Sequence, residues 1–319
     1  MHVSDILQYL PFPAPCMRTI LHVSDLHFGK ADPRLIALFV AECARICPDM
    51  LIVSGDLTQR GTLEEFEMTR VFLDTLRGTG IRHFVIPGNH DIRPLYHPIA
   101  RALTPFDRYK DAVGHDIEPR YIDDEIAIAA IDTVCRGRIL NGAVNKKQIE
   151  RTNAWFAQLH TNAVRIVVSH HPFDLPPGRS TRPPTIGAER VIRELDSSRI
   201  DLYLAGHHHI SSVLSTGDRY QGLSAPSIAV QAGTVSMREY GETQSFNLLT
   251  IHRDEIRVDI YHFDVSKTHF HIVSSHRCVR SERGWQVAEV ATNGRPLPIQ
   301  EMTPFAFASR ITWEILERL

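Results

Sequence analysis

Short apolar runs alternate with amphipathic stretches along the first part of this 319-residue chain. The short runs predict buried strands, and the stretches with apolar residues every three or four positions predict helices. In chain order these are a strand at 19–23, a helix at 33–46, a strand at 50–53, a helix at 63–77 and a strand at 83–86. Strand, helix and strand at this spacing favour parallel pairing through right-handed crossovers.

The alternation of predicted strands and helices continues after residue 120 and then changes. Further strands are predicted at 126–131, 165–169 and 201–204, with helices near 147–159 and 188–195. Beyond Gly206 the crossover helices stop, and strands joined by turns predict an antiparallel second half at 213–214, 227–231, 246–251 and 256–263. We therefore expect an α/β fold, a four-layer αββα sandwich of two mixed β-sheets flanked by helices.

Three segments are expected: an N-terminal lead-in (1–18), a main domain (19–268) and a C-terminal extension of less regular structure (269–319). Pro11 to Pro15 interrupt what would be the apolar region of a signal peptide. The extension is expected to end in a helix beginning near Thr303, with one apolar stripe formed by Phe307, Ile311, Ile315 and Leu319. The simplest interpretation is a tail packed on the core; a lid over the site and a homodimer contact are the alternatives.

The composition argues against several classes of protein. Because 35 basic and 37 acidic residues nearly balance, the chain lacks the cationic field on which sequence-independent binding to nucleic acids or anionic membranes depends. The longest apolar run, 35–41, is far shorter than the roughly 20 residues of a spanning helix, so no membrane span is expected. Five scattered cysteines suit free thiols in a reducing compartment, which predicts a cytoplasmic protein. Among them, Cys43 and Cys47 are expected to pack rather than to bind zinc.

Polar clusters follow five of the predicted strands directly. They are Asp25-Leu26-His27, Gly55-Asp56, Gly88-Asn89-His90-Asp91, His170-His171-Pro172 and Gly206-His207-His208-His209. Taken singly, each has an ordinary explanation as a turn or a helix cap. Because strand ends in α/β sheets converge on one rim, five such clusters together indicate one shared site. Carboxylate, imidazole and amide donors suit Mn²⁺, Fe²⁺/³⁺, Zn²⁺ or Co²⁺, and two such ions about 3.5–4 Å apart would activate a phosphoester for hydrolysis.

In this order the clusters resemble the signature of the calcineurin-like metallophosphoesterases, DxH, GD, GNH[DE], H and GHxH, over roughly residues 19–263. The resemblance implies a first metal ion held by Asp25, His27, Asp56 and His209. It implies a second ion held by Asp56, Asn89, His170 and His207, so that Asp56 bridges the two. Manganese or iron is the expected metal, with zinc or cobalt as alternatives.

The same resemblance implies roles for the neighbouring residues. His90 is the expected catalytic histidine, near the leaving-group oxygen and not a ligand. Asp91 either orients His90 or caps a helix. The family pattern H-x-P selects His170 rather than His171 as the ligand, because Pro172 fixes the register. His208 is expected to point away from the metals.

The sequences in and around the first three motifs most resemble those of the bacterial class III cyclic-nucleotide phosphodiesterases. This likeness implies hydrolysis of a small phosphodiester, for which a 3′,5′-cyclic nucleotide is one candidate, by in-line attack of a metal-bound hydroxide. A phosphomonoesterase or a nucleotide-lipid pyrophosphohydrolase on the same centre is the alternative, and a non-catalytic scaffold is the third. Gln59 stands where purple acid phosphatases place a tyrosine ligand, which argues against a tyrosinate-ligated iron site. The loop 173–185, with Arg179 and Arg182, either meets an anionic substrate or is a solvated connector.

Overall fold

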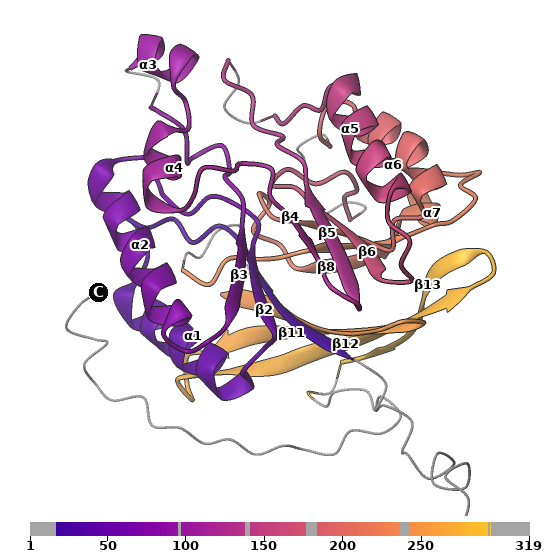
Figure 1. Ribbon diagram of the computed structural model, residues 1–319. Helices are drawn as coiled ribbons and strands as arrows, with labels where there is room; N and C mark the ends of the chain where they lie inside the picture. The colour runs from indigo at the N-terminus through magenta and orange to yellow at the C-terminus, as the bar shows by residue number, and fades with distance from the viewer. Residues whose placement is uncertain are drawn as a thin grey trace, which may run out of the picture.

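The computed structural model describes residues 17–94, 97–137, 141–176, 184–236, 243–292 and 294. Within these ranges the strands form two sheets, and helices lie on the outer face of each sheet (Figure 1). This arrangement confirms the expected α/β architecture of two mixed sheets flanked by helices.

The first sheet contains β1 (Arg18–Val23), β2 (Met50–Val53), β3 (Arg82–Val85), β10 (Ser245–His252), β11 (Glu255–Asp264), β12 (His269–Ser281) and β13 (Gly284–Ala291). Its strand order is β13-β12-β11-β10-β1-β2-β3. The second sheet contains β4 (Arg120–Ile122), β5 (Ile126–Ala130), β6 (Val164–Val168), β7 (Leu202–Ala205), β8 (Ser212–Ser215) and β9 (Ile228–Gln231). Its order is β4-β5-β6-β7-β9-β8, and β5, β6, β7 and β9 run parallel.

The helices divide between the two outer faces. Those on the side of the first sheet are α1 (Pro33–Ile46) and α2 (Leu63–Arg77), with the short α3 (Pro98–Leu103) and α4 (Asp107–Ala112) beyond them. Those on the side of the second sheet are α5 (Lys146–Ala157), α6 (Ala188–Leu195), the 3₁₀ turn η3 (Asp196–Ser198) and α7 (Thr216–Arg219). No helix in the described ranges combines the length and apolar character that crossing a bilayer demands.

Local sequence signals set the ends of the longer helices. The Asp32 side chain accepts a hydrogen bond from the Arg34 amide at the start of α1, and Pro33 occupies the first turn. A capping box between Thr62 and Glu65 begins α2. At the end of α1, Cys47 adopts the left-handed conformation that closes the helix, while Cys43 is buried among apolar neighbours. Cys43 therefore packs in the core as expected, whereas Cys47 is exposed and closes the helix through its backbone.

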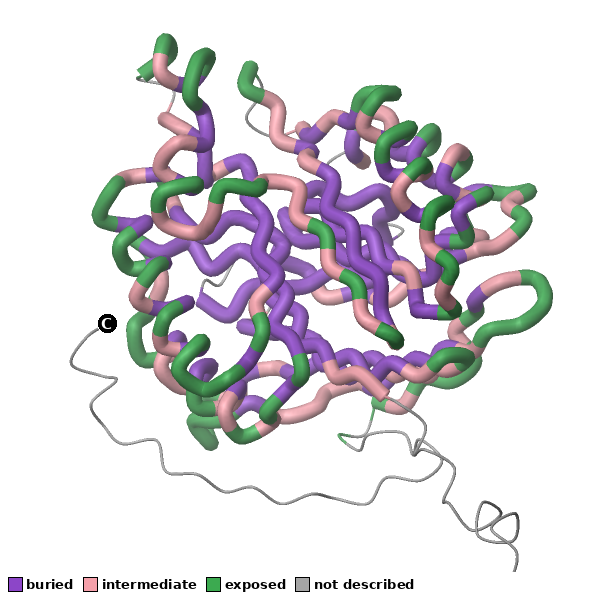
Figure 2. Tube along the Cα trace, viewed as in Figure 1, coloured by how far each residue is buried: buried purple, intermediate pink, exposed green. Residues whose placement is uncertain are grey.

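Apolar side chains fill three layers between and outside the sheets. One cluster packs α1 and α2 on the first sheet, a second fills the space between the sheets, and a third packs α5 and α6 on the second sheet. Figure 2 shows the buried chain in the interior and exposed positions on the outer helices and turns. The rigid inner layer fixes the relative position of the two sets of strand ends.

Two expectations about the second half are corrected. Strand β9 pairs in parallel with β7, although the β8–β9 and β10–β11 pairs are antiparallel as expected. Residues 269–291 are not irregular, because β12 and β13 extend the first sheet there. The Trp285 amide donates to the Pro226 carbonyl at 2.7 Å and its indole N–H donates to Asp201 at 2.7 Å, which anchors β13 against the second sheet. The helix expected from Thr303 lies outside the described residues, as do Arg179 and Arg182.

Candidate metal centre

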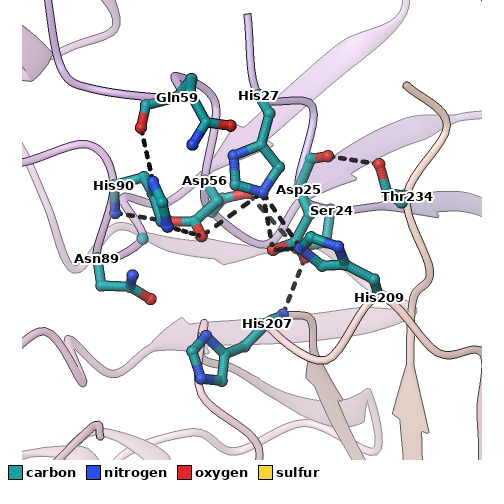
Figure 3. A network of polar contacts seen from close by, with 12 residues as sticks. Ser24, Asp25, His27, Asp56, Gln59, Asn89, His90, His207, His209 and Thr234 are labelled. Carbon is teal, nitrogen blue, oxygen red and sulfur yellow. Dashed lines mark hydrogen bonds and ion pairs between the residues drawn. The ribbon is translucent and has the colours of Figure 1, made fainter. Parts of the chain in front are cut away.

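The five polar clusters converge where strands of both sheets end. Loops after β1, β2 and β3 meet loops after β6 and β7. Figure 3 shows the side chains that come from the loops after β1, β2, β3 and β7. All eight predicted site residues lie together there: Asp25, His27, Asp56, Asn89, His90, His170, His207 and His209. Each predicted ligand is buried, although all are polar or charged.

One group of donors gathers around the Asp25 carboxylate. Its Oδ1 atom lies 3.0 Å from His209 Nε2 and 3.7 Å from His27 Nε2. The two imidazole nitrogens lie 3.2 Å apart. Three donor atoms this close, from residues up to 184 positions apart, form the pattern of a cation site.

A second group gathers around His170. Its Nε2 atom lies 3.0 Å from Asn89 Oδ1 and 3.3 Å from Asp56 Oδ2. The His207 ring lies 5.2 Å from the His170 ring, measured between centroids. Asn89 adds a neutral oxygen, so this group contains one carboxylate only.

Asp56 lies between the two groups. Its Oδ2 atom is 3.3 Å from His170 Nε2 on one side and 3.9 Å from His27 Nε2 on the other. Its Oδ1 atom accepts the His90 amide hydrogen at 2.8 Å, which fixes the carboxylate plane. Burial opposes ionisation, but the adjacent His170 and His90 lower the pKa of Asp56, so the carboxylate stays charged.

The tautomer of His170 indicates that this group fits a metal ion. Its Nδ1 atom lies 2.8 Å from the Ser54 carbonyl oxygen, which can only accept, so Nδ1 carries the hydrogen. In the neutral ring the Nε2 lone pair then faces two oxygen acceptors, an arrangement that a cation or a proton must stabilise. Burial disfavours the proton, yet the Asp56 carboxylate raises the pKa of His170 to about 9. The negative charge that favours a proton on Nε2 would equally favour a metal cation in its place.

Strained backbone holds these side chains in place. Five of the seven predicted ligands have left-handed φ angles: Asp25 (57°), His27 (48°), Asp56 (51°), His207 (72°) and His209 (57°). Such conformations cost roughly 1–3 kcal/mol each and persist only where the surroundings enforce them. Here the loops hold one another, since the Asp25 amide donates to the Gly55 carbonyl and the His207 amide donates to the Asp25 carboxylate, both at 2.9 Å.

The motif glycines are required by close approach. A Cβ atom on Gly88 would lie 2.2 Å from Asp56 Oδ1, and one on Gly206 would lie 1.8 Å from Ser24 Oγ. Neither glycine needs a left-handed φ. Space for neighbouring ligands, rather than chain flexibility, therefore explains both residues.

Gly88→Ala is accordingly expected to lower the metal content and the hydrolytic rate by more than about 10-fold, because the added methyl group displaces Asp56. Gly137→Ala is the matched control, since its Cβ would meet no atom within 4 Å. Metal content per chain by plasma mass spectrometry and the rate of ester hydrolysis are the measurements. If Gly88→Ala matched the control in both, the close approach would have no functional importance.

His90 differs from the other histidines of the site. Its side chain is 33% exposed, and its Nε2 atom lies 4.0 Å from Asp56 Oδ2. Its Nδ1 atom donates to the Gln59 carbonyl at 2.7 Å, so the other ring nitrogen faces the centre. The ring is thus oriented toward the space where a substrate would bind.

Asp91 joins two loops rather than capping a helix, and its expected role in orienting His90 stays a prediction. Its carboxylate accepts hydrogen bonds from the amides of Gly88, Leu57 and Thr58 and from the Thr58 hydroxyl, at 2.8–3.0 Å. It therefore joins the loop after β2 to the loop after β3. Burial and the nearby Asp56 raise the pKa of Asp91 to about 6.

The two remaining histidines of the doubled motifs are buried beside the site. His171 Nδ1 lies 2.9 Å from the Thr133 hydroxyl, and the rings of His171 and His207 are 4.3 Å apart. With His170 and His207, His171 forms a group of donor atoms close enough to hold a metal ion, so the choice of His170 rather than His171 as the ligand stays a prediction. His208 belongs to none of the described donor groups, and its ring meets His207 edge-on at 5.1 Å.

Two residues that support the site were not found from the sequence. The Thr234 hydroxyl donates to the Asp25 carbonyl at 2.6 Å, and the Ser236 hydroxyl donates to the Leu26 carbonyl. Both lie in the loop after β9 (Thr234 in Figure 3). That loop also follows a predicted strand, 227–231. Its position after a strand end was therefore the sequence feature that could have marked Thr234 and Ser236 as residues near the site.

The chain is similar to known phosphoesterases. The family model of the calcineurin-like phosphoesterases matches residues 18–211. The glycerophosphodiester phosphodiesterase GpdQ of Enterobacter lignolyticus is 29% identical over 182 residues, which are 52% of this chain and 60% of that protein. A probable GpdQ of Arcobacter nitrofigilis is 28% identical over 95 residues, 30% of this chain and 32% of that protein. The alignments thus span less than two thirds of these relatives.

Solved structures with the same fold include PhoD, with a TM-score of 0.63 at 11% identity over 90% of this chain and 74% of that one. The yellow lupin purple acid phosphatase PPD1 has a TM-score of 0.57 at 12% identity over 94% of this chain and 58% of that one. At such identities the likeness shows the fold alone. The chain belongs to the calcineurin-like phosphoesterase family, as the five motifs indicated.

Proposed function

We propose that this protein is a metal-dependent hydrolase of small phosphodiesters. Asp25, His27, Asp56 and His209 would hold one ion, and Asp56, Asn89, His170 and His207 the other, with manganese or iron as the expected metals. The observation that carries the proposal is the Asp56 carboxylate, 3.3 Å from one donor group and 3.9 Å from the other. The family and the two relatives named as phosphodiesterases support it.

The charge of the centre suits an anionic substrate. When bound, the two ions would polarise the phosphoryl group and lower the pKa of a water molecule toward neutrality. Asp25 and Asp56 are the two carboxylates among the seven proposed ligands, and Asn89 is neutral. Two divalent ions therefore leave a net positive site for a phosphodiester anion.

His90 is placed to transfer a proton. Its Nδ1 hydrogen stays with the Gln59 carbonyl, and its Nε2 atom faces the centre. In this role Nε2 donates a proton to the oxygen of the departing alcohol. Because the side chain is partly exposed, solvent can restore that proton.

Hydrolysis of two aryl esters tests the proposal. Protein stripped with a chelator and reloaded with Mn²⁺ is expected to hydrolyse bis(p-nitrophenyl) phosphate with a higher kcat/KM than p-nitrophenyl phosphate, and to lose both activities on chelation. Faster turnover of the monoester would favour the phosphomonoesterase alternative. Absence of metal-dependent turnover of either ester would refute the proposal. Among natural diesters, 3′,5′-cyclic nucleotides remain a candidate substrate.

A further inference from the structure

A cavity of about 410 Å³ lies between the edges of the two sheets. Its walls come from β8 on the second sheet and from β11, β12 and β13 on the first. Pro176 and Ser211 complete it, and they belong to the loops that carry His170 and His209. The cavity is therefore at the same end of the sheets as the metal centre.

Hydrogen bonds connect the cavity wall to the centre. The Ser211 hydroxyl accepts the Gly233 amide hydrogen at 3.2 Å, and it lies 3.0 Å from the Ser245 hydroxyl. The next residue after Gly233 is Thr234, whose hydroxyl donates to the Asp25 carbonyl at 2.6 Å. The segment 233–234 therefore contacts one residue of the cavity wall, Ser211, and supports a proposed ligand, Asp25.

Strand register places the cavity floor level with the end of β1. His22 pairs with Asn247, Asn247 with Ile260, and Ile260 with Ser274, in a row across β1, β10, β11 and β12. Ile260 and Ser274 line the cavity, whereas His22 lies three residues before Asp25. The cavity is therefore lateral to the centre, with Ile260 two strands and Ser274 three strands away from β1 in the same sheet.

The lining is uncharged and mixed in polarity. Aliphatic surface comes from Pro176, Val213, Ile260, Val273 and Val290. Hydroxyl and imidazole groups come from Ser211, Ser212, Ser274, Thr292, His262 and His276. Among the described residues that line the cavity, none is Lys, Arg, Asp or Glu. Burial lowers the pKa of His276, which favours its neutral form.

We propose that this cavity binds one ester arm of the substrate, and that this arm is uncharged and carries a ring, as in a nucleoside or an aryl ester. The inference rests on the proposed phosphodiesterase function. Aliphatic walls pack on the flat face of a ring, and hydroxyl and imidazole groups can hydrogen-bond its edges. The volume lies within the roughly 300–1,000 Å³ typical of small-molecule sites, more than a glycerol arm would fill. A cationic choline or ethanolamine arm would lose hydration without meeting a counter-charge.

Binding of an arm without its phosphate tests the cavity independently of catalysis. Thymidine is expected to bind the manganese-loaded full-length protein in isothermal titration calorimetry, whereas choline is not. Val290→Trp should weaken thymidine binding by at least about tenfold, equivalent to about 1.4 kcal/mol, because the indole would fill the cavity. Val290 is half exposed on the edge strand β13, so this strand can carry a larger side chain there.

Glu289→Trp is the matched control, since its exposed side chain points to the opposite face of β13. It should leave thymidine binding unchanged. Undetectable binding of thymidine to the wild type, equal binding of choline, or equal losses in the two Trp variants would each overturn the inference.

A kinetic comparison separates this inference from the proposed function. Methyl p-nitrophenyl phosphate and thymidine 5′-(p-nitrophenyl phosphate) release the same leaving group. Val290→Trp should raise KM for the thymidine ester by about tenfold or more, while kcat/KM for the methyl ester stays near that of the wild type. An equal change for both esters would contradict the subsite. Failure of the wild type to hydrolyse either ester would count against the proposed function, while thymidine binding still decides the subsite.

Discussion

Asp56→Asn is expected to abolish hydrolysis and to reduce metal binding from two ions to one or none. The Asp56 carboxylate lies between the two donor groups, and the substitution removes its negative charge with almost no change in shape. Loss of a second-sphere group alone costs about 10- to 100-fold in metal affinity, so loss of a shared ligand should exceed 100-fold. Metal content after desalting and the rate with bis(p-nitrophenyl) phosphate are the measurements.

The control is Asp124→Asn, which makes the same substitution at an exposed aspartate. It should keep both metal ions and full activity. Two tightly bound ions together with wild-type turnover in Asp56→Asn would show that Asp56 is not the bridge.

His90→Ala is expected to reduce kcat by about 10²- to 10⁴-fold while leaving the metal content unchanged. The reason is positional: His90 Nε2 faces the centre, but it lies 4.0 Å from the nearest Asp56 oxygen and its ring is held by the Gln59 carbonyl. Removal of the ring thus deletes a proton donor without deleting a proposed ligand. Steady-state kinetics and metal analysis on the same preparation test both halves of this expectation.

The leaving group separates proton donation from a structural effect. An alkyl ester, whose alkoxide needs a proton, should lose more activity in His90→Ala than a p-nitrophenyl ester, whose phenolate departs without one. His115→Ala, which removes an exposed imidazole, should affect neither ester. Equal losses for the two esters would contradict the role of His90 as proton donor.

The parts of the fold that follow local rules could be predicted from the sequence. The ranges expected for α1, β2, α2 and α6 match the structure to the residue. Apolar periodicity marks these elements, and Asp32 and the Thr62 capping box mark two helix starts. The convergence of the five motifs was also predictable, because each motif directly follows a strand and strand ends share a rim.

Other parts depended on contacts that sequence spacing does not reveal. Strands β12 and β13 were missed because β12 carries polar and basic residues at partly buried positions, and because each strand has one unpaired residue, Val273 in β12 and Ala288 in β13, that breaks the two-residue alternation. The support that Thr234 gives to Asp25 joins residues 209 positions apart. Asp91 acts through four hydrogen bonds to two loops, which no motif position specifies. The homodimer and the cytoplasmic location stay predictions.

Anomalous diffraction from crystals grown with Mn²⁺ tests the central claim most directly, which is that seven side chains hold two ions around Asp56. The account predicts two manganese peaks about 3.5–4 Å apart, one beside Asp25, His27 and His209 and the other beside Asn89, His170 and His207, with an Asp56 oxygen bound to both. A single peak, or two peaks that do not share Asp56, would contradict it.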